Sequence, residues 1–292
     1  MERITLSVHG LDRRYLLAGA TNDGPVSPRP VMVVLHGTGG TAAWADDETG
    51  WSRFAADRGF LVALPDGVPL DPARPPKFLT NPSRWADGSA FVLRPPAPGS
   101  HPDIGPVGDP DDIAFLTAVV ADLVARGADR RRVYLTGFSN GAGMAFRFAA
   151  ERAELLAAVA PVAGYCWTDA VPARPVPTLY VLGTADPLIP VRGGPVRLPW
   201  GGRLVKRPAV AVTLEKWASA NRCGPPVTVR EADGIREDVY PGPIEMRAVY
   251  LDGLGHHWPG GKGQLGERVG GPATDRYDGN DLVWEFCRRH HL

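Results

Sequence analysis

Cysteine is scarce in this sequence, and long apolar runs are absent. Three cysteines among 292 residues allow at most one disulfide, which excludes a disulfide-stapled scaffold, and no C-x-x-C pair indicates a zinc site. No stretch approaches the roughly 18 apolar residues of a membrane span. The first residues, MERITLSV, lack the apolar segment of a signal peptide. We therefore expect a soluble chain with no membrane or metal partner, either cytoplasmic or secreted after removal of a signal.

The sequence also lacks an excess of charge of either sign. Lys plus Arg and Asp plus Glu both number 32, so the formal net charge at pH 7 is zero. A neutral chain has no field that would attract nucleic acid or an anionic membrane, so we expect neither as a partner. No fixed-period repeat is present. The 44 % hydrophobic and 22 % charged residues are ordinary for a globular protein, which excludes intrinsic disorder.

Strand and helix patterns alternate along most of the chain. A leading hairpin is expected over 4–8 and 14–17, followed by buried strands at 31–35, 60–64, 133–136, 157–162, 178–182 and 246–251. Helices are expected between them at 46–59, 112–124, 141–152, 210–220 and 281–289. This alternation predicts an α/β fold with a mostly parallel central sheet and helices on both faces. We expect a single domain over residues 1–292, with loop insertions near 68–110 and 192–208.

A serine follows the strand at 133–136, inside the segment Gly137-Phe138-Ser139-Asn140-Gly141. This segment fits G-x-S-x-G and opens the next predicted helix, which is the context that a nucleophile elbow requires. Small neighbours allow the tight turn, and the turn presents the serine hydroxyl at the positive end of a helix dipole. The pattern therefore indicates Ser139 as a nucleophile, although a turn serine that only caps a helix would look similar.

An acid and a histidine follow two later strands. Asp186, in GTAD, comes after the strand at 178–182, and His256, in GHHW, comes after the strand at 246–251. Nucleophile, acid and histidine in this order are typical of α/β-hydrolases, and the carboxyl ends of parallel strands share one sheet edge. The neighbouring His257 is an alternative base, and we favour His256.

A second glycine cluster, His36-Gly37-Thr38-Gly39-Gly40, also follows a buried strand. In a hydrolase it would supply one backbone N–H of an oxyanion hole, and the N–H of Asn140 would supply the other. The same cluster formally matches a dinucleotide-binding fingerprint, with Asp66 after the next strand. That reading explains one segment only. The hydrolase reading also explains the serine turn, the aspartate and the histidine, so we favour it and expect no cofactor.

Five segments carry a closer resemblance: LHGTGGTAAW, GWSRFAADRGFLVALPDG, RRVYLTGFSNGAGMAFRFA, LGTADPLIP and GHHWPGG. In this order they resemble the polyhydroxybutyrate depolymerase-like esterases, a group similar to the feruloyl and acetylxylan esterases of carbohydrate esterase family one. The resemblance implies an α/β-hydrolase fold and a cofactor-free serine esterase. It places the triad on Ser139, Asp186 and His256 and the oxyanion hole on Thr38 and Asn140. Cys223 lacks the second cysteine with which many relatives form a disulfide.

The function that follows is hydrolysis of a carboxylic ester, small or polymeric, through an acyl-enzyme on Ser139. The acyl group would be feruloyl, acetyl or 3-hydroxybutyryl. An acyltransferase with the same triad is the alternative, and a non-catalytic binding protein on the same fold is a third possibility. Loops at 88–108 and 192–208 would decide the substrate. Four tryptophans near glycine- or proline-rich loops are candidates for substrate binding: Trp44, Trp85, Trp200 and Trp258.

Overall fold

The computed structural model describes residues 1–19, 27–89 and 111–292. Within them, ten strands form one sheet: β1 (Glu2–Val8), β2 (Leu11–Ala18), β3 (Arg29–Leu35), β4 (Leu61–Pro65), β7 (Ala128–Phe138), β8 (Ala158–Val162), β9 (Thr178–Gly183), β12 (Val227–Ala232), β13 (Ile235–Val239) and β14 (Met246–Leu251). Their order across the sheet is β1-β2-β4-β3-β7-β8-β9-β14-β13-β12.

The centre of the sheet is parallel and its edges are antiparallel. Strands β4, β3, β7, β8, β9 and β14 run parallel to one another, whereas β1, β2, β13 and β12 pair antiparallel. Every residue of β4, β8 and β9 is buried, as expected for strands covered on both faces. The prediction of a mostly parallel sheet is confirmed.

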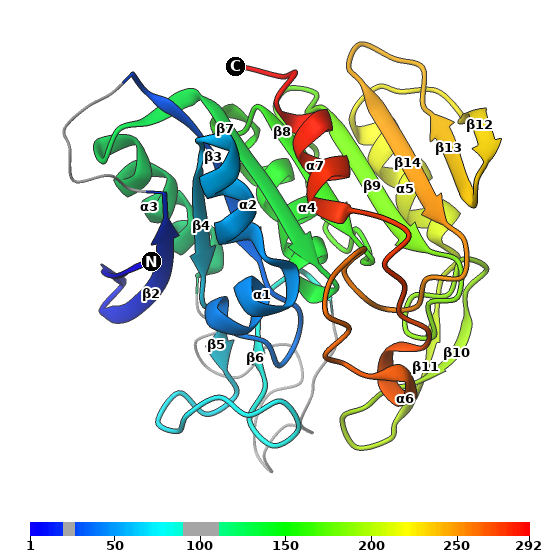
Figure 1. Cartoon of the computed structure of the whole chain (residues 1–292), viewed down its shortest axis with the longest axis horizontal. Coiled ribbons are helices and arrows are strands. Elements are labelled where there is room, and N and C mark those ends of the chain that lie inside the picture. The colour runs from blue at the N-terminus through cyan, green and yellow to red at the C-terminus, as the bar shows by residue number, and fades with distance from the viewer. Residues whose placement is uncertain (20–26, 90–110) are drawn as a thin grey trace.

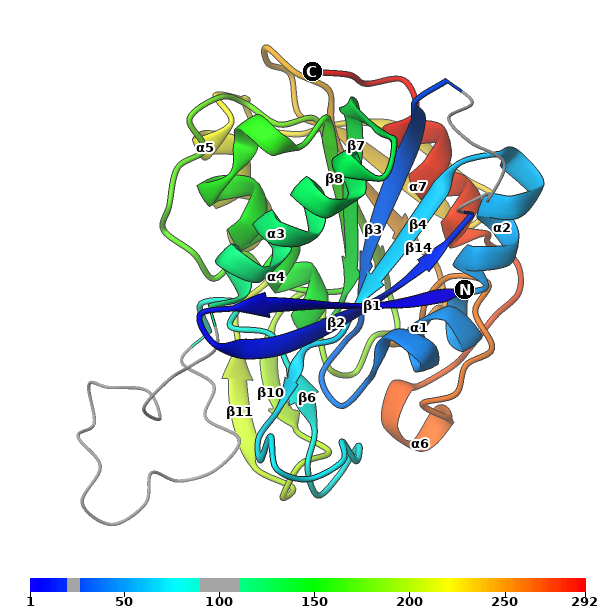
Figure 2. The ribbon, with the colours of Figure 1, turned by 90° about the vertical axis from the view of Figure 1, so that its left-hand side faces the viewer.

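Helices cover both faces of the sheet. Figure 1 shows α1 (Ala42–Thr49), α2 (Trp51–Arg58) and α7 (Gly279–Cys287) on the near face, and Figure 2 shows α3 (Asp112–Ala125), α4 (Asn140–Glu151) and α5 (Val210–Ala220) on the other. A short α6 (Glu267–Gly270) and a 3-10 turn (Ala153–Leu155) complete the helical elements of the described residues. Asp111 caps α3 by accepting a hydrogen bond from the Ala114 amide. The buried apolar residues between the layers form one cluster, and a single domain stays a prediction.

The helix expected over 46–59 is two helices. Gly50 lies between α1 and α2 with φ 69°, a left-handed conformation that ends α1. Its amide donates to the Asp46 carbonyl at 2.7 Å. The hydrophobic pattern continues through this break, because both helices pack against β4, and the pattern therefore does not reveal it.

Two antiparallel edge strands were missing from the sequence-based prediction. Strands β12 and β13 form a hairpin that adds to β14. All six residues of β12 are exposed, so this strand has no buried face. The signal present in the sequence is the Asp233-Gly234 pair between β12 and β13, both residues with positive φ, which is typical of a two-residue hairpin turn and was not used in the prediction. Pairing with β13, and not burial, makes this segment a strand.

Two small hairpin sheets lie beyond the carboxyl ends of the parallel strands (Figure 2). One pairs β5 (Val68–Pro69) with β6 (Ser83–Arg84), and the other pairs β10 (Gly194–Arg197) with β11 (Leu204–Arg207). They belong to the two loop insertions expected near 68–110 and 192–208, of which residues 90–110 lie outside the described residues. The insertions therefore carry structure of their own at the functional edge of the sheet.

Three further observations concern the described residues. None of their helices is both long and apolar enough to cross a bilayer. Cys166, Cys223 and Cys287 are free thiols, and two of them are buried. Cys223 therefore takes no part in the disulfide found in many of the proteins that this sequence resembles.

Candidate active site

Ser139 lies at the turn between β7 and α4, in a conformation that side chains rarely adopt. Its φ is 58° and its ψ is −116°, and its amide donates to the Val162 carbonyl at 2.9 Å. Such strain persists only where the surrounding structure enforces it. The turn directs the hydroxyl outward from the sheet edge, at the positive end of α4.

Glycines make this turn possible. A Cβ on Gly137 would lie 2.3 Å from the Gly141 carbonyl oxygen, and a Cβ on Gly141 would lie 2.5 Å from the carbonyl oxygens of Leu35 and His36. No side chain fits at either position. The strand, the turn and the following helix therefore approach more closely than any other residue would allow.

A chain of hydrogen bonds runs from Ser139 to a buried carboxylate. His256 Nε2 lies 2.9 Å from Ser139 Oγ, and His256 Nδ1 lies 2.7 Å from Asp186 Oδ2. Both His256 and Asp186 are less than 5 % exposed. The Asp186 Oδ1 accepts amide hydrogen bonds from Leu188 at 2.8 Å and Ile189 at 2.7 Å, which fix the carboxylate. A proton on Nδ1 donated to Asp186 leaves Nε2 able to accept the serine proton.

The structure distinguishes the two adjacent histidines. His257 is also buried, but its Nε2 lies 3.0 Å from the Gly271 carbonyl oxygen. This hydrogen bond links His257 to Gly271, at the far end of the loop that follows His256. Of the two, the structure brings only His256 to Ser139.

The two residues predicted to supply the oxyanion hole, Thr38 and Asn140, line the cavity beside Ser139. Thr38 lies in a turn closed by the Gly40 amide, which donates to the Gly37 carbonyl at 3.0 Å, and Asn140 is the first residue of α4. Within the described residues, neither the Thr38 nor the Asn140 amide donates to a protein acceptor. Free amides beside a nucleophile can stabilise a developing negative charge.

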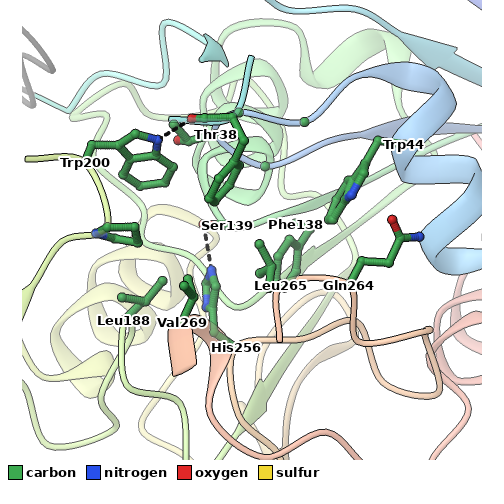
Figure 3. Close-up of a pocket in the computed structure, with 15 residues that line it drawn as sticks. Thr38, Trp44, Phe138, Ser139, Leu188, Trp200, His256, Gln264, Leu265 and Val269 are labelled. Atoms are coloured by element: carbon green, nitrogen blue, oxygen red, sulfur yellow. Dashed lines mark hydrogen bonds between the residues drawn. The ribbon is translucent and has the colours of Figure 1, made fainter. Parts of the chain in front are cut away.

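A cleft of about 310 Å³ opens beside Ser139 (Figure 3). Trp44 and Trp200 lie on opposite sides of the serine, and His256 lies below it. Most of the wall is apolar and comes from four separate segments: residues 37–44, Phe78, residues 188–200 and residues 264–269. A volume of this size suits a small organic ligand.

Two of the four candidate tryptophans line the cleft, and two do not. Trp44 and Trp200 are lining residues, and Trp200 Nε1 donates to the Phe78 carbonyl at 2.7 Å. Trp85 and Trp258 are buried outside it, with their Nε1 atoms bound to the His36 carbonyl and to Asn280 Oδ1, each at 2.9 Å. Neither side chain lines the cleft, so the structure does not bring Trp85 and Trp258 to the candidate site, and their role in substrate binding stays a prediction.

Several lining residues were not identified from the sequence. They include the apolar side chains Phe78, Phe138, Leu188, Leu265 and Val269. Phe138 is inside the G-x-S-x-G motif, where its apolar character was visible. Leu265 and Val269 follow the glycine-rich segment 260–263. That segment indicates an irregular loop, but it does not indicate that the loop lies against the cleft. The others lie in loops without periodicity.

In the structure, Asp66 of the dinucleotide-binding pattern makes a contact that such a site would not allow. Asp66 Oδ1 accepts a hydrogen bond of 2.7 Å from the Ala42 amide at the start of α1. The carboxylate thus interacts with the helix terminus that a pyrophosphate would occupy in a dinucleotide site. Among the described residues, no group of three or more His, Cys, Asp or Glu side chains is arranged to hold a metal ion.

The sheet order, the elbow at Ser139 and the hydrogen-bonded aspartate and histidine at the same edge together define an α/β-hydrolase. No family model matches the chain. The chain is 32 % identical over 295 residues to “Putative esterase NocK” of Nocardia uniformis subsp. tsuyamanensis, with 92 % of this chain and 77 % of that protein covered. The chain therefore belongs to the α/β-hydrolase family of serine esterases.

Further comparisons agree with this assignment. The chain is 28 % identical over 236 residues to “Feruloyl esterase B” of Piromyces equi, which covers 70 % of this chain and 44 % of that protein. A thermostable esterase matches all of this chain and 63 % of its own, with a TM-score of 0.56 at 14 % identity. An acetyl xylan esterase from Aspergillus awamori matches 88 % of this chain and 94 % of its own, with a TM-score of 0.55 at 14 % identity. The two solved structures show the shared fold.

Proposed function

We propose that this esterase hydrolyses carboxylic esters through a covalent acyl-enzyme on Ser139. The observation that carries the proposal is the unbroken series of hydrogen bonds from Asp186 through His256 to Ser139 Oγ. It ends at the mouth of a largely apolar cleft, beside two free amides. A serine hydroxyl becomes a competent nucleophile when an adjacent base accepts its proton.

The proposed first half-reaction forms the acyl-enzyme. His256 Nε2 takes the Ser139 proton while Oγ forms a bond to the ester carbonyl carbon, and the carbonyl electron pair moves to oxygen. The amides of Thr38 and Asn140 stabilise that oxyanion. The oxyanion then collapses, the bond to the alcohol oxygen breaks, and the leaving alcohol takes the proton from His256.

In the second half-reaction, water repeats the attack. His256 takes a proton from water as the hydroxyl oxygen adds to the acyl carbon, and Ser139 leaves with that proton. Asp186 stays ionised and holds the imidazole in one orientation throughout. No cofactor enters the proposed cycle, and no nucleic acid or membrane partner is proposed. Esters of acetate, ferulate or 3-hydroxybutyrate are the substrate candidates.

The first prediction concerns Ser139. The Ser139→Ala variant should fold and lose about 10⁴-fold or more in kcat, because the covalent route is removed while binding remains. The measurement is initial rates on an aryl acetate, methyl ferulate and a soluble 3-hydroxybutyrate oligomer, together with burst-phase acylation by stopped flow. Unfolding curves establish that both proteins are folded.

Ser219→Ala is the matched control, because Ser219 is exposed on α5. It should retain the activity of the unchanged protein. Turnover by Ser139→Ala equal to that of this control would contradict the proposed nucleophile. An added alcohol that captures most of the acyl group would point to an acyltransferase.

A further inference from the structure

A second, smaller compartment meets the cleft at Ser139. Its volume is about 60 Å³, against about 310 Å³ for the cleft. Thr38, Ser139, Leu188 and Trp200 line both spaces, so the two meet at the reacting hydroxyl and beside one of the oxyanion amides. An ester carbonyl at this junction would direct one of its two substituents into each space.

His256 determines which substituent goes where. It lines the larger cleft, and it is not among the described residues that line the smaller compartment. The proton that His256 takes from Ser139 has to reach the leaving alcohol oxygen, so that oxygen has to lie within hydrogen-bond distance of Nε2. The alcohol portion of the ester therefore occupies the larger cleft, and the acyl portion points into the smaller compartment.

The smaller compartment, as the described residues define it, is small in volume. A water molecule needs roughly 10–15 Å³ of such space, so 60 Å³ holds only about four to six small groups. Ile189 and Leu198 contribute to its wall, and both are at most 5 % exposed. Packed, buried side chains leave little freedom for the wall to move.

The backbone around the compartment is equally constrained. The Tyr165 hydroxyl donates to the Pro208 carbonyl at 3.1 Å, which ties the wall to the segment that follows β11. A Cβ on Gly164 would lie 2.4 Å from the Ser139 carbonyl oxygen, so the backbone already touches the elbow there. The Ile189 amide is bound to Asp186, which fixes a third side.

We propose that this enzyme selects esters of short acyl groups, of about two to four carbons, with a bulky apolar or aromatic alcohol. The proposal rests on the proposed serine esterase function and adds the orientation of the ester to it. The larger cleft supplies the apolar surface for the alcohol through Trp44, Leu265 and Val269. Of the candidate acyl groups, acetyl and a single 3-hydroxybutyryl unit fit this size, and feruloyl does not.

A pair of isomeric esters tests the orientation. In 2-phenylethyl acetate the aromatic ring is on the alcohol, and in methyl 3-phenylpropanoate it is on the acyl group. Both leaving groups are unactivated primary alcohols, so the difference in rate reports on fit. We expect kcat/KM to be about tenfold or more higher for 2-phenylethyl acetate, measured by titration of released acid.

Equal rates, or a preference for methyl 3-phenylpropanoate, would overturn the proposed orientation. Hydrolysis of both esters at the rate of Ser139→Ala would instead mean that the serine esterase proposal fails. The two failures are therefore distinguishable in the same experiment.

Enlarging the small compartment should relax the selectivity. In Leu198→Ala, we expect the ratio of the two kcat/KM values to move about fivefold or more toward methyl 3-phenylpropanoate, because space opens on the acyl side only. Leu204→Ala is the matched control, since Leu204 lies on the same hairpin and is 62 % exposed. An unchanged ratio in a folded Leu198→Ala protein would count against the assignment, and the isomer pair on the unchanged enzyme tests it independently.

Discussion

His36 fixes the peptide unit that carries one of the two proposed oxyanion donors. Its Nε2 accepts a hydrogen bond of 2.9 Å from the Gly67 amide, so the ring proton lies on Nδ1, which donates to the Gly37 carbonyl at 2.8 Å. Burial lowers the pKa of His36 and favours this neutral form. Because a trans peptide holds C=O and N–H on opposite sides, fixing the Gly37 carbonyl also aims the Thr38 amide.

We expect His36→Gln to lower kcat by about tenfold to a hundredfold with little change in KM. The loss is bounded by the roughly 3–4 kcal/mol that one oxyanion donor contributes. The affinity of a ketone inhibitor that forms a tetrahedral adduct should fall in parallel with kcat. If His36→Gln raised KM and left kcat unchanged, His36 would act on substrate binding instead.

At the scale of elements, α1 holds the loop that forms one wall of the cleft. We call residues 257–271, which follow His256, the cleft loop. The Glu48 carboxylate is 4 % exposed and accepts hydrogen bonds from the Gly263 amide at 2.8 Å and the Gln264 amide at 3.0 Å. Trp44, one turn earlier on α1, lines the cleft that the loop closes with Leu265. Hydrogen bonds from the cleft loop to Glu48 therefore hold the loop against α1, and both contribute to the cleft wall.

Glu48→Gln keeps the shape of the side chain but places an NH₂ group against one of these two amides. We expect KM for 2-phenylethyl acetate to rise several-fold, kcat to change little, and the free energy of unfolding to fall by about 1–3 kcal/mol. Steady-state kinetics and urea unfolding measure these effects.

Asp47→Asn is the matched control for Glu48→Gln. Asp47 is exposed and interacts with Lys262 and Gln264 of the same loop, and the Lys262 ammonium lowers its pKa. We expect little effect on either measurement, because exposed ion pairs contribute little. If Glu48→Gln lowered kcat at constant KM, the loop would act on His256 rather than on the cleft wall.

At the scale of the whole molecule, a buried ion pair joins the antiparallel edge of the sheet to a helix layer. Arg13 of β2 lies 2.7 Å from Asp112 at the start of α3, and both are at most 4 % exposed. The guanidinium stacks over the Phe115 ring, and Asp112 also accepts from the Ala86 amide at 2.7 Å. Burial raises the pKa of Asp112 even though Arg13 acts to lower it.

Arg13→Ala should lower the free energy of unfolding by about 3–5 kcal/mol near pH 7, because it leaves a carboxylate buried without its cation. Without Arg13 the pKa of folded Asp112 rises further above its unfolded value. The native variant then binds the proton more tightly than the unfolded chain, so its stability recovers as the pH falls. Urea unfolding at about pH 7 and pH 5 should show the deficit shrinking.

The control for Arg13→Ala is Arg126→Ala. Arg126 pairs with Asp122 and Glu2 at the surface and is 38 % exposed. We expect a loss below about 1 kcal/mol with no comparable dependence on pH. Similar losses of unfolding free energy in the two variants would mean that burial does not increase the contribution of the Arg13–Asp112 pair to stability.

The sequence by itself determined the features that local chain conformation produces. Continuous apolar runs predicted the parallel strands, because strands buried on both faces need apolar residues at every position. The glycines at 137 and 141 predicted the elbow, because only glycine fits such close approaches. The order of Ser139, Asp186 and His256 at the ends of three parallel strands predicted their meeting, since parallel strands share one carboxyl edge.

Only the tertiary structure decided which neighbours these residues have. Two adjacent histidines look alike in the sequence, yet one faces Ser139 and the other binds the Gly271 carbonyl. The cleft walls come from segments far apart in the chain, such as Trp44, Trp200 and Leu265, in regions without periodicity. Their meeting depends on packing between loops, which local patterns do not encode. The two unequal compartments at Ser139, and with them the proposed orientation of the ester, follow from that packing alone.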